Sequence, residues 1–128
     1  MNVNAILDHA GAAVATIEPT AALASAVRLL AERGIGALVV LGAGLRVIGI
    51  ISEQDIVRLL AERGAAALHE PVGQAMNRKV ATCNGGEPAR RVMQRMTAGK
   101  FRHLAVVEKD RLIGIVSVDD VARQLHTA

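Results

Sequence analysis

Two short polar motifs, Ser52-x-x-Asp55 and Ser117-x-x-Asp120, carry the residue types in this chain that could do chemistry. A serine followed three residues later by an acid can cap the start of a helix, where the helix dipole also favours the acid. The same groups could bind a ligand. Backbone N–H groups at a helix start attract phosphate, and a carboxylate can accept hydrogen bonds from both hydroxyls of a ribose. Both roles stay open, and one serine can serve in both.

The two motifs belong to two copies of one internal repeat. The matching segments, at offsets of 65 or 66 residues, are residues 47–57 with 112–122, 14–16 with 80–82, and 35–40 with 101–106. The change of offset by one residue falls between the last two strands of the repeat, where a turn tolerates it. A lead-in also repeats, because residues 3–7 match residues 72–76.

Each copy predicts the same order of elements, β-α-β-β-α, from its apolar periodicity and its turn residues. In the first copy these are strand 14–17, helix 19–33, strands 37–41 and 47–51, and a helix from Ser52 to before Gly64. In the second copy they are 80–83, 88–98, 103–107, 112–116 and 117–126.

The size of each copy predicts how the two are organised. A unit of about 60 residues is marginally stable alone, so the two copies should bury their sheets against each other. We therefore predict an α/β (α+β) fold in which repeat 1, residues 1–66, and repeat 2, residues 67–128, form one pseudo-two-fold module. A cleft should lie on the axis of that module.

The composition excludes several classes of protein. Of the 128 residues, 52% are hydrophobic and 21% are charged, which supports a packed core and argues against disorder. Phe101 is the only aromatic residue, so no aromatic platform can stack bases, and we predict no nucleic-acid partner. The net charge of +3 mildly favours anionic ligands.

Localisation is predicted from the cysteine count and the N-terminus. One cysteine, Cys83, excludes an intramolecular disulfide framework and a cysteine zinc site, and no signal peptide is recognisable. The longest apolar stretch, residues 35–51, is broken by Arg46 and contains four glycines, which favours two strands and a turn over a membrane span. We predict a cytoplasmic protein with no membrane partner.

This pattern resembles the cystathionine-β-synthase (CBS) domain pair, or Bateman module, in its stand-alone bacterial form. The resemblance rests on the blocks Ile48-Gly49-Ile50-Ile51-Ser52-x-x-Asp55 and Ile113-Gly114-Ile115-Val116-Ser117-x-x-Asp120, and on residues 100–107. The family commonly has proline where Val39 and Ala105 stand, and we treat that departure as minor. The resemblance implies a regulatory sensor that binds an adenine nucleotide in the cleft, forms a homodimer and acts on an unidentified regulated protein. AMP is the first choice of ligand, followed by ADP, ATP, NAD(H) and S-adenosylmethionine; no cofactor is required.

The resemblance also implies roles for individual residues. Asp55 and Asp120 should hold ribose, and Ser52 and Ser117 should touch ribose or phosphate. The backbone edge that recognises adenine should come from the first strands, each serving the site anchored by the other repeat's aspartate. Val39 and Ala105 would form aliphatic walls, although each on its own is better explained as strand core. The strand residues concerned are Ala15, Thr16 and Ile17 in one copy and Ala81, Thr82 and Cys83 in the other.

Arg102 and His103 are the candidates for binding phosphate. Their counterparts in the first copy are Gly36 and Ala37, so the sequence predicts two unequal sites. A partly buried, hydrogen-bonded histidine is an equally open interpretation of His103. One dinucleotide such as NAD, with its adenosine in one site, is a further alternative.

No catalytic or metal-binding residue is predicted. Cys83 has no identifiable base partner, and the spacing of His9, His69 and His126 indicates no metal site. We therefore predict that the protein is not an enzyme. The alternative function is a structural or oligomerisation module with degenerate ligand sites, in which the serine and aspartate only cap helices.

Overall fold

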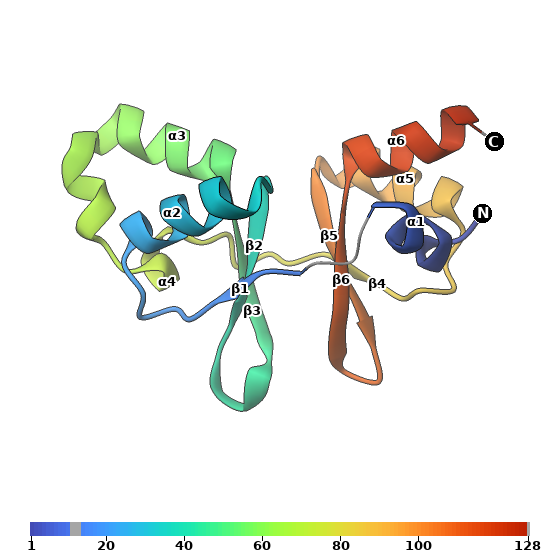
Figure 1. Cartoon of the computed structure of the whole chain (residues 1–128), viewed down its shortest axis with the longest axis horizontal. Helices are drawn as coiled ribbons and strands as arrows, with labels where there is room; N and C mark the ends of the chain where they lie inside the picture. The colour runs from blue at the N-terminus through green and yellow to red at the C-terminus, as the bar shows by residue number, and fades with distance from the viewer. Residues whose placement is uncertain (11–13, 128) are drawn as a thin grey trace. The chain divides into compact units, whose positions relative to one another are not determined.

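A computed structural model describes residues 1–10 and 14–127 of the chain (Figure 1). They form two compact units. Ala15–Val80 is the first-repeat unit, and Met1–Val14 together with Ala81–Ala128 is the second-repeat unit. The boundaries of these packed units differ from those of the sequence repeats. The division of the repeats between residues 66 and 67 stays a prediction. Each lead-in segment packs with the repeat that it does not precede.

The first-repeat unit contains a three-stranded sheet in the order β1-β2-β3, with β1 parallel to β2 and β3 antiparallel to β2. Helices α2 and α3 lie on the same side of this sheet (Figure 1). The elements are β1 Thr16–Ile17, α2 Leu23–Arg33, β2 Ala37–Leu41, the short helix η1 Ala43–Leu45, β3 Val47–Ser52, α3 Glu53–Arg63, η2 Gly64–His69 and α4 Val72–Ala75.

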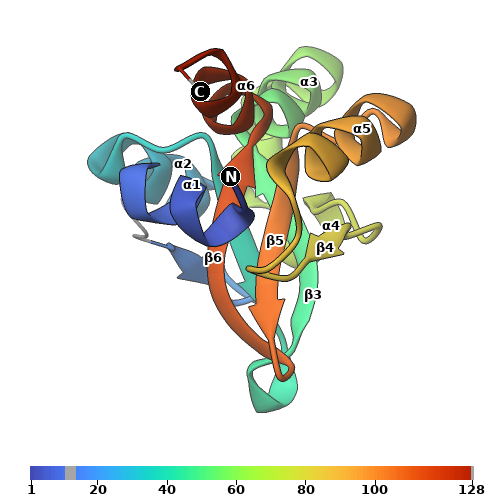
Figure 2. The ribbon, with the colours of Figure 1, turned by 90° about the vertical axis from the view of Figure 1, so that its right-hand side faces the viewer.

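The second-repeat unit repeats this plan with sheet order β4-β5-β6. Figure 2 shows that sheet behind α1 and α5. The elements are α1 Val3–Ala10, β4 Thr82–Cys83, α5 Ala89–Gly99, β5 His103–Glu108, β6 Arg111–Ser117 and α6 Val118–Thr127. The predicted fold class and the repeated β-α-β-β-α order are confirmed.

The helix after each first strand begins later than predicted. Helix α2 starts at Leu23 rather than at Pro19, because Glu18 to Ala21 form a turn in which the Ala21 N–H donates to the Glu18 carbonyl at 3.2 Å. Proline at the second position of such a turn is as favourable as proline in the first turn of a helix, so the sequence could not distinguish the two.

Alternation along the strands determines which residues form the cores. In the first-repeat unit Leu38 and Val40 of β2 pack among buried residues of the helices. Leu104 and Val106 of β5 do the same in the second-repeat unit. The helix residues that contribute are Leu23, Leu30 and Ile56 in one core and Val92, Met96 and Val121 in the other. The intervening strand residues therefore face the opposite side of each sheet.

The lead-ins dock by the same backbone contacts in both units. In one, the Val72 N–H donates to the Ala21 carbonyl at 2.8 Å; in the other, the Val3 N–H donates to the Glu87 carbonyl at 3.0 Å. The repeated glycine of the third strand makes room for them. A Cβ on Gly49 would lie 2.3 Å from the Met76 sulfur, and one on Gly114 would lie 2.6 Å from a Leu7 methyl carbon.

Replacing Gly114 by alanine should therefore destabilise the fold by about 1–3 kcal/mol through overpacking against Leu7. Urea denaturation measures this, with Gly86→Ala as the matched control, because a Cβ there meets its nearest neighbour at 3.5 Å. In a Leu7→Ala background the Gly114→Ala cost should shrink, since the clashing methyl carbon is gone. Equal costs in both backgrounds would contradict the packing explanation.

Candidate functional site

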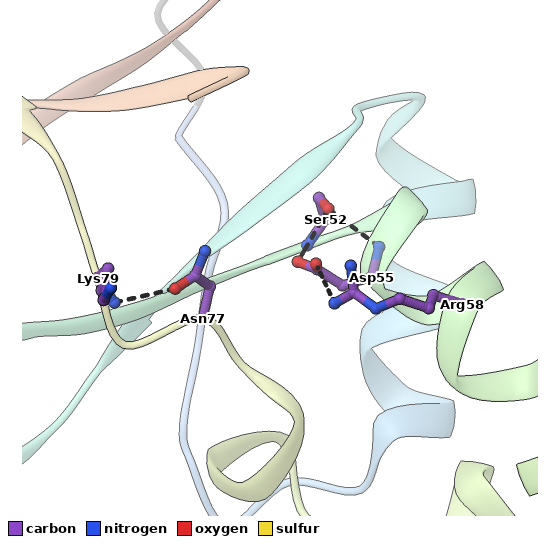
Figure 3. Close-up of polar contacts among 5 residues, drawn as sticks. All are labelled: Ser52, Asp55, Arg58, Asn77 and Lys79. Atoms are coloured by element: carbon purple, nitrogen blue, oxygen red, sulfur yellow. Dashed lines mark hydrogen bonds and ion pairs between the residues drawn. The ribbon is translucent and has the colours of Figure 1, made fainter. Parts of the chain in front are cut away.

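The Ser52-x-x-Asp55 motif forms a capping box at the start of α3 (Figure 3). The Asp55 N–H donates to Ser52 Oγ at 3.2 Å, and the Ser52 N–H donates to Asp55 Oδ2 at 3.0 Å. Ser52 Oγ also donates to Asp55 Oδ2 at 2.9 Å. The predicted cap is present, and it fixes the position of the carboxylate at the strand-to-helix junction.

The other carboxylate oxygen of Asp55 is held by an arginine that the sequence analysis did not single out. Arg58 Nη2 lies 3.0 Å from Asp55 Oδ1, an ion pair three residues apart on α3. The Arg58 side chain is 63% exposed and that of Asp55 15%. An exposed pair of this kind contributes little to stability, so Arg58 can move aside without a large cost. Its i, i+3 spacing is the signal that could have identified it.

The Ser117-x-x-Asp120 motif makes the same reciprocal cap at the start of α6. The Ser117 N–H donates to Asp120 Oδ2 at 3.1 Å, and the Asp120 N–H donates to Ser117 Oγ at 3.1 Å. Ser117 and Asp120 are both partly exposed, whereas Ser52 is buried. The two repeats therefore share the hydrogen bonds of the cap but differ in how open it is.

Strand register places the predicted residues of each repeat on one sheet face. In the first-repeat unit Thr16 pairs with Val39 of β2, and Ser52 pairs with Ala37 of β2. Ala37 and Val39 are two positions apart on that strand. Two positions correspond to about 6.6 Å along a strand. These residues alternate with the core residues of β2, so they share the face that the helices do not cover.

The second-repeat unit has the equivalent arrangement with a different side chain beside the serine. Thr82 pairs with Ala105, and His103 pairs with Ser117. Arg102 directly precedes His103, and the Arg102 carbonyl accepts the N–H of Val118 at 2.9 Å. The second-repeat unit thus brings Arg102, His103, Ser117 and Asp120 to one strand-to-helix junction, where the first has Gly36 and Ala37.

The remaining first-strand residues point toward the cores. Ala15 belongs to one core and Cys83 to the other, with Ile17 and Ala81 packed against them. The Ala15 carbonyl accepts the N–H of Val39 at 3.2 Å, and the Ala81 carbonyl accepts that of Ala105 at 3.1 Å. Only the intervening threonines, both exposed, present their side chains on the other face.

Comparison with known proteins assigns this arrangement to a family. The CBS domain matches residues 10–62 and 72–127. The chain belongs to the CBS domain family. The pair is similar to the CBS-domain containing protein ATU1752 from Agrobacterium tumefaciens, with 38% identity, a TM-score of 0.88, and coverage of 95% of this chain and 91% of that one. A putative signal-transduction protein with CBS domains from Burkholderia ambifaria has 30% identity and a TM-score of 0.87, with coverage of 99% and 95%.

Curated proteins are similar to this chain as well. An uncharacterized 17.7 kDa protein of Acidianus ambivalens is 32% identical over 113 residues, which are 88% of this chain and 67% of that protein. The mitochondrial CBS domain-containing protein CBSX3 of Arabidopsis thaliana is 34% identical over 102 residues. That match covers 77% of this chain and 50% of CBSX3, so the CBS pair corresponds to half of that relative.

Cys83 of the CBS pair is buried and chemically quiet. Burial and, to a smaller extent, the charge of Glu87 raise the pKa of the Cys83 thiol, the charge of Arg95 lowers it, and the net result is a pKa of about 11. A thiol with this pKa is protonated at neutral pH, so it is a poor nucleophile. Among the side chains that the structure describes, those of residues 1–8 and 14–126, no cluster of three or more His, Cys, Asp or Glu residues could hold a metal ion. None of the described helices is long and apolar enough to cross a bilayer.

Two hollows lie within the first-repeat unit of the pair. The larger, about 640 Å³, is an apolar groove that includes residues of α2 and α3, and its lining residues include Val27, Ala31, Glu53, Val57, Leu60 and Leu68. The smaller, about 460 Å³, lies beside β1 and the turn after β2, lined by Thr16, Ile17, Glu18, Ala21, Leu41, Gly42 and Leu45. Sequence reasoning named Thr16 and Ile17 but neither hollow, because both depend on tertiary packing.

Replacing Ser52 by alanine should lower the free energy of unfolding by about 1 kcal/mol, because it removes the cap of α3. Chemical denaturation of the ligand-free protein measures this. Ser25→Ala is the matched control, since Ser25 lies exposed inside α2, where alanine is the better helix former. A Ser52 variant as stable as wild type would contradict a structural role for the cap.

Proposed function

We propose that this CBS domain pair is a non-enzymatic regulatory module that binds an adenine nucleotide, with AMP as the first choice. The observation that carries the proposal is a duplicated arrangement: a threonine and a capping serine share one sheet face, and the aspartate that completes the cap lies in the first turn of the following helix. The position of the ligand between the repeats, expected from the sequence, is part of the proposal.

The chemistry of each junction suits a nucleoside phosphate. A carboxylate fixed by backbone N–H groups can accept hydrogen bonds from ribose hydroxyls, as the acid of dinucleotide-binding folds does. The start of a ten-residue helix, α6, favours an anion, and Arg102 and His103 add cationic or hydrogen-bonding capacity beside it. The second-repeat junction is therefore the better phosphate site of the two.

Two solved structures of the same fold hold adenine compounds. The CBS domain protein PAE2072 from Pyrobaculum aerophilum is complexed with AMP, at 24% identity and a TM-score of 0.84. The CBS domain pair of protein MJ0100 is in complex with 5′-methylthioadenosine and S-adenosyl-L-methionine, at 23% identity and a TM-score of 0.83. These ligands belong to those proteins, and at such identity the likeness extends to the fold alone. They support the adenine class as one that this fold can accommodate.

Regulation would follow from differential binding. A ligand shifts a conformational equilibrium only by the difference in its affinity for the two states. Binding at the junctions would change the relative packing of the repeats, and a regulated partner protein would respond to that change.

Asp120→Asn should weaken AMP binding about 10- to 150-fold, the equivalent of losing 1.5–3 kcal/mol of charged hydrogen bonding to ribose. Asparagine keeps an oxygen that can accept the Ser117 N–H, so the cap survives. Asp119→Asn is the control, because it removes the same charge from the exposed neighbouring position. Isothermal titration calorimetry gives the affinities, and equal affinity of both variants would reject the ribose role.

A structural or oligomerisation module with degenerate sites is the competing function. A thermal-shift scan with AMP, ADP, ATP, NAD(H) and S-adenosylmethionine separates the two functions. A ligand that binds the native state must raise the unfolding midpoint once its concentration exceeds its dissociation constant. No shift with any of them at millimolar concentration would favour the structural module.

We also propose that the groove between α2 and α3 is where a second copy of this chain binds to form the homodimer. Val57 in this groove is 66% exposed, the exposed Glu53 is among its lining residues, and α2 carries the exposed Arg28 and Arg33. A two-fold axis can place such opposite charges against each other.

Sedimentation should show that the wild type is a dimer. Val57→Glu should raise the dissociation constant of the dimer at least tenfold, whereas Leu45→Glu, at a 76% exposed position outside the groove, should leave it unchanged. A monomeric wild type would reject the dimer.

A further inference from the structure

Arg95 makes contacts that nothing in the proposed function uses. From α5 its Nη2 donates to the Thr82 carbonyl at 2.6 Å, and its Nη1 lies 3.1 Å from Glu87 Oε1. The other Glu87 oxygen accepts the Asn84 N–H at 2.8 Å. Arg95 and Glu87, together called the edge latch, thus tie α5 to the end of β4 through two backbone groups.

The Thr82 carbonyl lies on the outer edge of the sheet. Strand β4 is an edge strand, and the Ala81 carbonyl accepts the N–H of Ala105 on β5. Because successive carbonyls of a strand point to opposite sides, the Thr82 carbonyl points away from β5. An outer edge of this kind is where a ligand or another chain can add hydrogen bonds. The edge latch occupies that position on β4.

The first repeat lacks the edge latch. At an offset of 66 residues, Ala21 stands in place of Glu87 and Leu29 in place of Arg95, and neither side chain can donate or accept a hydrogen bond. Instead the hollow of about 460 Å³ lies beside Thr16, with Ala21 in its wall. The backbone contacts around these positions are otherwise the same in both repeats, as the docking of the lead-ins shows. The difference is therefore one of side chains.

We propose that the edge latch closes the outer edge of β4. Of the two equivalent strands β1 and β4, it is then β1 whose outer edge can accept an N–H donor from a ligand, such as the exocyclic amine of adenine. The ligand in this inference rests on the proposed function. The closed edge itself does not, because it follows from contacts inside the second-repeat unit. Arg95 and Glu87 then determine which of two similar strands recognises the base.

The edge latch acts locally rather than on global stability. The Arg95 side chain is 39% exposed, and an ion pair at such a position contributes little to the free energy of unfolding. Cys83 follows Thr82 directly and is the single cysteine of the chain, so its labelling rate reports whether this end of β4 opens.

Removing the charge of Arg95 and opening the strand change the labelling rate of Cys83 in opposite directions. The charge of Arg95 lowers the pKa of Cys83, so its removal alone raises that pKa and slows labelling by reducing the thiolate fraction. Release of the strand exposes the thiol and speeds labelling. A faster reaction in an Arg95 variant can therefore be assigned to opening.

The first experiment measures N-ethylmaleimide labelling of Cys83 in the ligand-free full chain at pH 8. Arg95→Met should react about tenfold faster than wild type, the factor expected from the loss of one net hydrogen bond. Arg91→Met is the control, since it removes the same charge from an exposed position on α5. Circular dichroism and the unfolding midpoint confirm that both variants fold. An unchanged or slower reaction of Arg95→Met would overturn the latch.

The second experiment measures the stoichiometry and affinity of AMP by calorimetry. Wild type should bind one AMP per chain, and Arg95→Met should gain a second, weaker site as the β4 edge opens. The reciprocal variant Ala21→Glu with Leu29→Arg installs a latch in the first repeat and should lower the original affinity at least tenfold. Two equal sites in wild type, or no added site in Arg95→Met, would overturn the assignment.

The two experiments fail in different ways. If AMP binds to no variant, the proposed function is wrong and so is the ligand role of the edge, while the labelling rates still decide whether the latch closes β4. If the reciprocal variant does not fold, Arg95→Met alone decides the assignment.

Discussion

Both units depend on a lead-in segment that fits against a glycine on the third strand. Met76 meets Gly49, and Leu7 meets Gly114, at distances that leave no room for a side chain on either glycine. Without the lead-in, a three-stranded sheet with two helices would leave part of its third strand uncovered. The repeated glycine is therefore a packing requirement of the fold, and its presence in both motif blocks is explained without reference to a ligand.

The cap at each strand-to-helix junction links this packing to the candidate site. The third strand ends at the serine, and the serine and aspartate exchange hydrogen bonds that fix both groups before any ligand arrives. Such preorganisation lowers the entropic cost of binding. It also explains why sequence reasoning could not choose between a capping and a binding role, since one geometry satisfies both.

Much of the fold could be predicted from the sequence, because alternating apolar residues and the internal repeat define the strands, the helices and their order. The start of α2 was predicted too early, because Pro19 suits a turn and a helix start equally well. The exchange of lead-ins was missed, since nothing local in residues 3–7 indicates which sheet they contact. The sequence places Arg95 with Arg90 and Arg91 on one helix and favours a solvated face for all three. The contact of Arg95 with Thr82 could not be predicted, because Thr82 is distant in sequence and the contact is to a backbone carbonyl, which carries no residue-type signal.

The exchange of lead-ins also gives the chain a topology that its two similar repeats conceal. The first-repeat unit is one continuous segment inserted into a second-repeat unit whose parts are Met1–Val14 and Ala81–Ala128. Closing that second unit means closing a loop of residues 15–80, and loop closure costs less entropy once the enclosed chain is compact. The inserted unit can therefore form from its own segment, while helix α1, although it precedes that segment in the chain, has to wait for residues 81–128 before its apolar face is covered.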